Sequence, residues 1–339
     1  MYSEEEGKRI KTIQEIFIPT PHLQSIIDQM KKCRELSKLN GYKVEPDCVL
    51  VTGETGVGKT TLIEQYMSKS PRLILEDKTK VPVLSTYLPT TKSDKDVISH
   101  LLRELGDPAE GEGGTATKLT KRFADLLKET GVEMIIIDEF HHAIEKKSEM
   151  VIHRVADLLK NIVSDSKIPM MLFGMPWSTH ILDVNHQLAR RFDIHKHITH
   201  FTKDTFPEFR KFLDKIDKKL PFEQSSNLSD EELAFRLFAA SKGNLSVLIK
   251  GFIRRAGIKA VETGQPNIPI EYFSQEFTEV YKKLTSKENV FELPINDIKV
   301  EECPEDAESY WDYKAKRGKT KVVDMRYKKR SVTDFLVTR

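Results

Sequence analysis

Hydrophobic positions follow two different patterns along the 339 residues of the chain. Before residue 200, short continuous apolar runs predict buried strands, at 48–51, 81–88, 134–137 and 169–173. Apolar residues with helical spacing lie between and around them, at 22–39, 60–68, 97–105, 119–127 and 151–164. Apolar strands that alternate with helices are typical of a parallel sheet covered on both faces. We therefore expect an α/β domain at 21–200, after an N-terminal extension at 1–20.

Beyond residue 200 only helical periodicity continues, at 206–216, 230–241, 245–263 and 270–284. These segments predict a small all-α domain at 201–290. Residues 291–339 differ again, with an acidic stretch, the aromatic segment YWDY at 310–313 and a basic run at 314–330. Their low apolar density predicts a flexible C-terminal tail. Its interleaved aromatic and basic residues suggest a segment that docks a partner.

The apolar run at 48–51 leads into a glycine-rich segment that fits G-x-x-x-x-G-K-[ST] at every fixed position. Its three glycines allow turns closed to other residues, so that successive N–H groups converge on phosphate oxygens. Lys59 adds a cation for the β- and γ-phosphates and Thr60 a hydroxyl for Mg²⁺, while the helix that begins here directs its positive end at the same anion. The strand before and the helix after distinguish this motif from a structural turn, and the helix at 22–39 would cover the adenine side. The predicted nucleotide-binding residues are Gly53, Glu54, Thr55, Gly56, Val57, Gly58, Lys59, Thr60 and Thr61.

The apolar run at 134–137 ends in Asp138 and Glu139. In open α/β sheets, ligands bind at the carboxyl ends of the strands. An aspartate there can hold the Mg²⁺ shell, and a glutamate beside it can accept a proton from the water that attacks the γ-phosphate. The glutamate favours hydrolysis over phosphoryl transfer to a small acceptor. An ordinary acidic turn is the alternative interpretation.

Arg190 and Arg191 follow the apolar run at 169–173. Two adjacent arginines can simply be solvated surface residues. The sharper hypothesis is that one of them is an arginine finger, which reaches the γ-phosphate bound by a neighbouring subunit. Hydrolysis would then depend on oligomerisation.

Two groups of histidines are candidate metal ligands. His195, His197 and His200 have the spacing H-x-H-x-x-H, but surface histidines on an edge strand at 194–198 are the favoured interpretation. His141 and His142 follow the acidic pair after Phe140 and are close enough to sense the γ-phosphate. They lack cysteine or carboxylate partners at the usual spacing, so we reject zinc there.

Basic residues gather on predicted loops and helix starts beyond the strand ends. Each cluster alone is typical of a solvated face, but together they form a surface that can face the central pore of a ring. Their contacts with DNA would be made to phosphates, without sequence specificity and with a steep dependence on salt. The candidates are Thr91, Lys92, Lys95, Lys118, Lys121, Arg122, Lys146 and Lys147.

Composition adds only broad limits. Hydrophobic residues make up 39% and charged residues 31% of the chain, and the net charge of +2 is too small to indicate nucleic-acid binding. The three cysteines are far apart, which suits a reducing cytosol and excludes a disulfide framework or a zinc ribbon. No apolar run has the length of a membrane span, and the N-terminus lacks the apolar core of a signal peptide. We expect a cytoplasmic protein.

Five segments occur in an order that resembles a known family: GETGVGKT at 53–60, IIIDEFHH at 135–142, PMMLFGMP at 169–176, QLARRF at 187–192 and GNLSVLIKGFIRRA at 243–256. The chain looks like an AAA+ ATPase, and specifically like the TniB/TnsC branch of transposition regulators. The histidines after the acidic pair and the segment IFIPTPHLQSII at 16–27 are the more branch-specific parts. The resemblance covers roughly residues 10–285.

The resemblance implies a five-stranded parallel sheet, an α-helical lid and ATP-dependent assembly into rings or helical filaments on double-stranded DNA. Family members link a TniQ- or TnsD-like target selector to a TnsB-like and sometimes TnsA-like transposase, and hydrolysis is a timer that disassembles the filament. By resemblance, Lys59 and Thr60 would bind ATP and Mg²⁺, and Asp138 would support the metal. Glu139 would activate water, and Arg190 or Arg191 would be the finger. The ATPase would be slow and dependent on assembly.

Two positions depart from the AAA+ pattern. Ser246 stands where the lid arginine called sensor two is expected, and Lys250, Arg254 or Arg255 are candidate substitutes. The segment at 174–176 offers no polar sensor-one residue. Both departures bear on the rate of hydrolysis more than on nucleotide binding.

Two alternative functions share the nucleotide-binding residues. One is an origin-recognition or helicase-loader AAA+ protein, which a winged-helix domain would favour. The other is a STAND-like scaffold that binds nucleotide tightly without DNA, which the missing sensor two favours.

Overall fold

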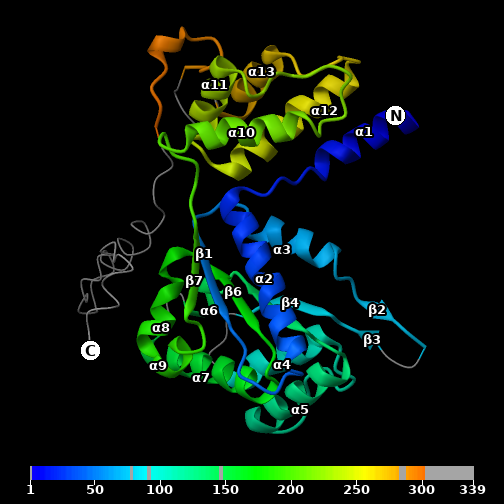
Figure 1. Cartoon of the computed structure of the whole chain (residues 1–339), viewed down its shortest axis with the longest axis vertical. Helices are drawn as coiled ribbons and strands as arrows, with labels where there is room; N and C mark the ends of the chain where they lie inside the picture. The colour runs from blue at the N-terminus through cyan, green and yellow to red at the C-terminus, as the bar shows by residue number, and fades with distance from the viewer. Residues whose placement is uncertain (1, 77–78, 90–92, 145–147, 282–287, 302–339) are drawn as a thin grey trace. The chain divides into compact units, whose positions relative to one another are not determined.

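Five parallel strands form the sheet that positions the nucleotide motifs (Figure 1). They are β1 (Val49–Gly53), β4 (Val83–Tyr87), β5 (Met134–Asp138), β6 (Met170–Gly174) and β7 (Ile194–Ile198). Their order across the sheet is β4-β5-β6-β1-β7, and each neighbouring pair is parallel. The computed structural model describes residues 2–76, 79–89, 93–144, 148–281 and 288–301, all of which lie in one compact unit. The expected five-stranded parallel sheet is confirmed.

The strands are apolar on both faces because helices cover both faces. Neighbouring residues of a strand point to opposite sides, so Leu50 and Val49 lie in two different core clusters. The Leu50 side is covered by α4 (Asp94–Leu105), α5 (Ala116–Glu129), α7 (Glu149–Ser166), α8 (His180–Val184) and α9 (His186–Ala189). The Val49 side is covered by α2 (Pro21–Leu39) and α3 (Lys59–Ser68).

Local sequence determines where the longer helices start. The hydroxyl of Thr20 accepts a hydrogen bond from the N–H of Leu23, and Pro21 occupies the first turn of α2. Ser93 caps α4 in the same way, and Gly106 ends it with a left-handed φ of 98°. Several short elements were not predicted, namely the antiparallel pair β2 (Leu73–Ile74) and β3 (Thr79–Lys80), α6 (His141–Ile144) and the 3₁₀ turn η1 (Pro176–Thr179).

The residues after β7 form a helical lid around a phenylalanine-rich core. Its elements are α10 (Phe206–Asp217), α11 (Glu231–Ser241), the π-helical turn η2 (Val247–Ile253), α12 (Arg254–Glu262) and α13 (Ile270–Tyr281). Phe209, Phe238, Phe252 and Phe273 are all buried in its core. The sequence pattern predicts one continuous helix at 245–263, whereas its first half is a π-helix, a geometry that is frequent at functional sites.

Two further segments pack into this lid core. The helix α1 (Glu4–Gln14) begins with a capping box between Ser3 and Glu6, and it buries Ile10 and Ile13 in the lid. At the other end, Phe291 lies in the same core, just before the short turn η3 (Ile295–Asp297).

Arg236 holds this C-terminal segment. Its guanidinium donates hydrogen bonds to the carbonyl oxygens of Val290 and Leu293 at 2.6 and 2.9 Å. The lid therefore uses residues from both the predicted extension and the start of the predicted tail; the region of the tail beyond 301 lies outside the described residues. None of the helices in the described ranges has the length and apolar character needed to cross a bilayer.

We predict that Ile13→Ala lowers the free energy of unfolding by about 2–5 kcal/mol, because it leaves a cavity where α1 meets the lid. Urea denaturation followed by circular dichroism measures the change. The control is Thr12→Ala on the exposed side of the same helix, with an expected effect within about 0.5 kcal/mol. Equal, small effects of both substitutions would contradict the packing of α1 in the lid.

Candidate nucleotide site

The phosphate-binding loop connects β1 to α3 and has the backbone geometry expected for an anion cradle. Gly56 and Gly58 have φ values of 87° and 97°, which are strained for residues with a Cβ. The ammonium of Lys59 is buried, and it donates hydrogen bonds to the carbonyl oxygens of Gly53 (2.6 Å) and Glu54 (3.0 Å). A cation is thus held within the loop, next to the start of α3.

Gly53 has a different role from the one predicted. It is the last residue of β1 and not a left-handed turn. A Cβ at this position would lie 2.8 Å from the carbonyl oxygen of Ile198 in β7. Glycine is needed here because β7 approaches the backbone closely, a contact that only the folded sheet creates.

The loop and the acidic pair meet at the carboxyl edge of the sheet. The Thr60 hydroxyl donates a 2.9 Å hydrogen bond to Oδ2 of Asp138, and the Glu139 N–H donates a 2.8 Å bond to Oδ1. Burial raises the pKa of the Asp138 carboxyl, although both hydrogen bonds act in the opposite direction. A carboxylate and a hydroxyl at this distance are hard oxygen ligands, and this donor set fits Mg²⁺.

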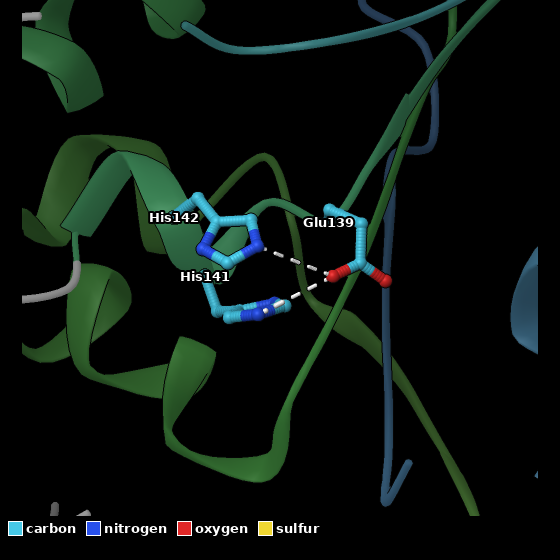
Figure 2. A group of neighbouring side chains, drawn as sticks. All are labelled: Glu139, His141 and His142. Carbon is cyan, nitrogen blue, oxygen red and sulfur yellow. Dashed lines mark ion pairs between the residues drawn. The ribbon is translucent and has the colours of Figure 1, made fainter. Parts of the chain in front are cut away.

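Glu139 follows β5 with a left-handed φ of 48°, an uncommon conformation for this residue type. The next residue returns to the sheet, since the Phe140 N–H donates to the carbonyl of Phe173 at 2.8 Å. This bend directs the Glu139 carboxylate towards His141 and His142, as Figure 2 shows. The Oε2 atom lies 3.4 Å from Nε2 of His141 and 3.5 Å from Nε2 of His142. The sequence offered these histidines no carboxylate partner at the usual spacing, whereas the structure places the Glu139 carboxylate beside both of them.

A pocket with mainly apolar walls adjoins the phosphate loop. Its lining residues come from the segment before α2, from α2, from the end of the loop and from the lid: Ile16, Phe17, Ile18, Leu23, Gly58, Thr61, Phe212, Ile216, Leu245, Ser246, Ile249, Lys250 and Arg254. Apolar walls beside a phosphate cradle suit the flat faces of a purine base. Leu23 belongs to the helix that was expected to cover the adenine side. The sequence did not predict that the segment at 16–18 lines this pocket, because it does so only when the lid packs against it.

Three basic residues of the lid were candidates for sensor two, and they have different environments. Arg255 is held by an ion pair in which its Nε lies 3.2 Å from the Glu276 carboxylate. Lys250 and Arg254 line the pocket. Burial lowers the pKa of the Arg254 guanidinium, with Glu64 acting in the opposite direction. Its Nε is buried and has no hydrogen-bond partner within the described part of the chain, so Arg254 is the best-placed substitute.

Ser246 contacts the phosphate loop through its backbone. Its N–H donates to the Gly56 carbonyl at 2.9 Å, and the Asn244 side chain donates to the Thr55 carbonyl at 3.2 Å. A Cβ on Gly56 would lie 2.5 Å from Asn244 Oδ1. The lid is therefore in direct contact with the loop. The contact of Asn244 with the loop was not predicted from the sequence, where only its position in the GNLS segment at 243–246 could have indicated it.

Met175 occupies the expected sensor-one region after β6. Its sulfur lies 3.8 Å from the Thr55 hydroxyl and 3.9 Å from Nζ of Lys59. A thioether is only a weak hydrogen-bond acceptor. The segment at 174–176 thus places a thioether beside Lys59.

Comparison with protein families identifies the chain. The family model described as "Bacterial TniB protein" matches residues 9–201. The chain belongs to the TniB family. A search of curated proteins found no match.

Solved structures show the fold that this TniB-family protein shares. The Aeropyrum pernix ORC2 protein (ADPNP-ADP complexes) has 15% identity and a TM-score of 0.54, over 79% of this chain and 71% of that one. For CDC6P from Pyrobaculum aerophilum the values are 15% and 0.53, over 80% and 70%. The A. pernix ORC1 protein in complex with DNA has 14% identity and a TM-score of 0.53, over 81% and 70%. At this identity the likeness shows the fold alone, which is that of an AAA+ ATPase.

The two arginines of the TniB-family chain differ sharply. Arg191 is largely buried and donates to Glu45 at 2.6 Å and to Ser164 at 2.9 Å. Arg190 is exposed, and its side chain has no hydrogen-bond or ion-pair partner among the described residues. Arg191 therefore contacts other parts of its own chain, whereas the exposed Arg190 side chain makes no such contact with the described residues.

The candidate DNA-binding residues of this TniB-family protein differ in their exposure and contacts. Lys95, Lys118 and Lys121 are exposed on α4 and α5. Arg122 instead forms a 2.6 Å ion pair with the buried Asp107 and supports the loop before α5. The remaining DNA candidates lie outside the described residues: Thr91, Lys92, Lys146 and Lys147.

The histidines of β7 do not form a metal site with each other. His195 contacts the Phe192 carbonyl oxygen at 2.8 Å, and Nδ1 of His197 contacts the Thr52 hydroxyl at 2.9 Å. β7 is an edge strand and both histidines are exposed. The interpretation of surface histidines on an edge strand agrees with this geometry.

We predict that Arg191→Ala lowers the free energy of unfolding by about 1–2 kcal/mol, because Glu45 and Ser164 lose their partner. Arg190→Ala, one residue away, is the control and should change stability by less than about 0.5 kcal/mol. Thermal and urea unfolding of both variants tests this difference. A larger loss in Arg190→Ala would show that the two side chains have been assigned the wrong roles.

Proposed function

We propose that this chain is an ATPase that assembles on double-stranded DNA and regulates DNA transposition. The observation that carries the proposal is the 2.9 Å hydrogen bond between Thr60 and Asp138, which joins the phosphate loop to the acidic pair. ATP is the proposed substrate and Mg²⁺ the proposed cofactor. The match to the TniB family supports the role in transposition.

Each residue of the site has a proposed task. The loop N–H groups and Lys59 bind the phosphates, and the pocket beside them takes the adenine. Thr60 and Asp138 would hold Mg²⁺, which would neutralise phosphate charge. Glu139 accepts a proton from the attacking water. Because Asn244 touches the loop and Arg254 lines the pocket, we infer that nucleotide binding changes how firmly the lid is held.

Arg190 is the proposed finger for the γ-phosphate of a neighbouring subunit. Its exposure and lack of an intrachain partner in the described ranges favour it over Arg191. A site completed by another subunit makes hydrolysis slow in the monomer and faster in the assembly. Hydrolysis would then act as a timer that dissolves the assembly.

The DNA contacts are proposed for Lys95, Lys118 and Lys121, whose exposed ammonium groups suit phosphate binding. The structure of the A. pernix ORC1 protein in complex with DNA has the same fold, which is compatible with a DNA partner. A target selector of the TniQ or TnsD type and a TnsB- or TnsA-like transposase are the proposed protein partners. The proposed docking segment, at 311–330, lies outside the described residues.

The two alternatives receive less support. Likeness to origin-recognition proteins at 14–15% identity extends to the fold only, whereas the family match is to TniB. The STAND-like alternative relied on a missing sensor two, and Arg254 is a suitable substitute in the pocket.

Electron microscopy with linear duplex DNA tests the proposal most directly. With a non-hydrolysable ATP analogue we expect rings or filaments on the DNA, and without nucleotide we expect none. Assembly that is independent of DNA would favour the scaffold alternative.

We predict that Lys59→Ala abolishes ATP-dependent assembly on DNA, because the loop loses its cation for the phosphates. Lys69→Ala, which removes an exposed lysine at the end of the same helix, is the matched control and should assemble normally.

Glu139→Gln should bind ATP and remain on DNA as a stable oligomer, since only water activation is lost. Normal ATP turnover by Glu139→Gln would refute the role of Glu139 as the base.

We predict that Arg190→Ala lowers the hydrolysis rate of the assembled protein by about 10³-fold, and that Arg191→Ala has a much smaller effect. A mixing experiment tests action between subunits. Glu139→Gln retains the finger and Arg190→Ala retains the base, so an equal mixture should recover about a quarter of the wild-type rate if subunits combine at random. A mixture no faster than its separate components would exclude a finger that acts in trans.

A further inference from the structure

Glu139, His141 and His142 form a compact group beside the proposed site of hydrolysis (Figure 2). Each residue contributes one ligand atom, and the three atoms lie within 4.8 Å of one another. The group combines two imidazole nitrogens with one carboxylate oxygen, a set that is common in transition-metal sites. It differs from the Thr60–Asp138 pair, which offers oxygen ligands only.

The spacing of the atoms fits a tetrahedral metal ion. Ligand atoms about 2.0–2.1 Å from a tetrahedral Zn²⁺ are separated from each other by about 3.3–3.4 Å. Oε2 of Glu139 lies 3.4 Å from Nε2 of His141 and 3.5 Å from Nε2 of His142. Two of the three distances between ligand atoms therefore have nearly the length that a tetrahedral site requires.

The backbone fixes this arrangement. One residue separates the left-handed Glu139 from the start of α6, and the His142 N–H donates to the Glu139 carbonyl at 3.0 Å. The His141 ring packs edge-on against Trp177, with 5.9 Å between the ring centroids. Ligands held by local hydrogen bonds and packing lose little freedom when a metal binds.

Access is provided from one side. The side chain of His141 is 9% exposed, whereas those of His142 and Glu139 are 51% and 45% exposed. A metal ion can therefore approach Glu139 and His142 from solvent and then reach the more buried His141. Three protein ligands leave a fourth position for water or for a phosphate oxygen.

We propose that Glu139, His141 and His142 bind one Zn²⁺ ion, and that this ion inhibits ATP hydrolysis. Imidazole ligands favour zinc over Mg²⁺ or Ca²⁺, which prefer sites made of oxygen atoms. The bound ion engages the same carboxylate that is proposed to activate water. Lys59, Thr60 and Asp138 are not used, so ATP stays bound while its hydrolysis stops. The inhibition rests on the proposed function, but the binding of zinc does not.

Zinc binding is tested first, by titration of the full chain at pH 8 in competition with a chromophoric chelator. The parent for this titration carries Cys303→Ser, which removes a thiol that lies outside the described residues and could bind zinc. The other two cysteines, Cys33 and Cys48, are buried, and burial raises the pKa of the Cys48 thiol to about 12. We expect the parent to bind one equivalent of zinc tightly. His141→Ala and His142→Ala should each lower the zinc affinity by about 100-fold or more.

His153→Ala, which removes an exposed histidine of α7, is the matched control and should bind zinc like the parent. His142 is half exposed, so its replacement is compatible with folding even if His141→Ala proves unstable. Unchanged zinc affinity in His142→Ala would overturn the site.

The second experiment measures ATP turnover in Mg²⁺ with and without one equivalent of zinc. Zinc should suppress the parent rate at least tenfold, and a zinc-selective chelator that spares Mg²⁺ should restore it. The rate of His142→Ala with zinc, relative to its own zinc-free rate, should fall less than twofold. Equal suppression of both proteins would refute inhibition through this site. A parent without zinc-free turnover would refute the proposed hydrolysis, while the titration would still decide the zinc site.

Discussion

The hydrogen bond from Thr60 to Asp138 joins two motifs that the chain keeps far apart. It exists because β1 and β5 run in the same direction with β6 between them, so that their carboxyl ends open onto one crevice. This strand order places the phosphate loop and the acidic pair near each other at the carboxyl edge of the sheet. The site of this TniB-family chain therefore depends on the sheet, which brings the two motifs together.

The same crevice also explains why the lid matters. Asn244 and Ser246 contact the carbonyl groups of the phosphate loop, and Arg254 lines the adjoining pocket. The lid core in turn buries Ile13 from the N-terminus. A change in the loop can thus reach the lid through direct contacts and then a packed core, which resists deformation. This continuity is the physical basis for the coupling that we propose between nucleotide state and assembly.

Much of this arrangement could be predicted from local patterns, and the failures have a common cause. The apolar runs at 134–137 and 169–173 and the loop residues Lys59 and Thr60 carry their signals within a few positions. The role of Gly53, the ion pair of Arg122 and the packing of α1 depend on partners that are distant in sequence. Periodicity detects a buried face but not the surface that covers it. The family resemblance implied five parallel strands but not their order, which only the structure gives.

Glu139 illustrates the limit most clearly. As a motif it follows Asp138 and predicts a catalytic base, yet its left-handed backbone decides which groups its carboxylate faces. That bend brings it to His141 and His142, two and three positions along the chain, where ordinary helix or strand geometry gives no reason to expect a shared site. We propose that Glu139 acts in the assembled protein, and in the single chain its carboxylate already lies beside two histidines. Under the proposed function, competition between those histidines and the attacking water for the Glu139 carboxylate would keep an ATP-bound assembly from dissolving early.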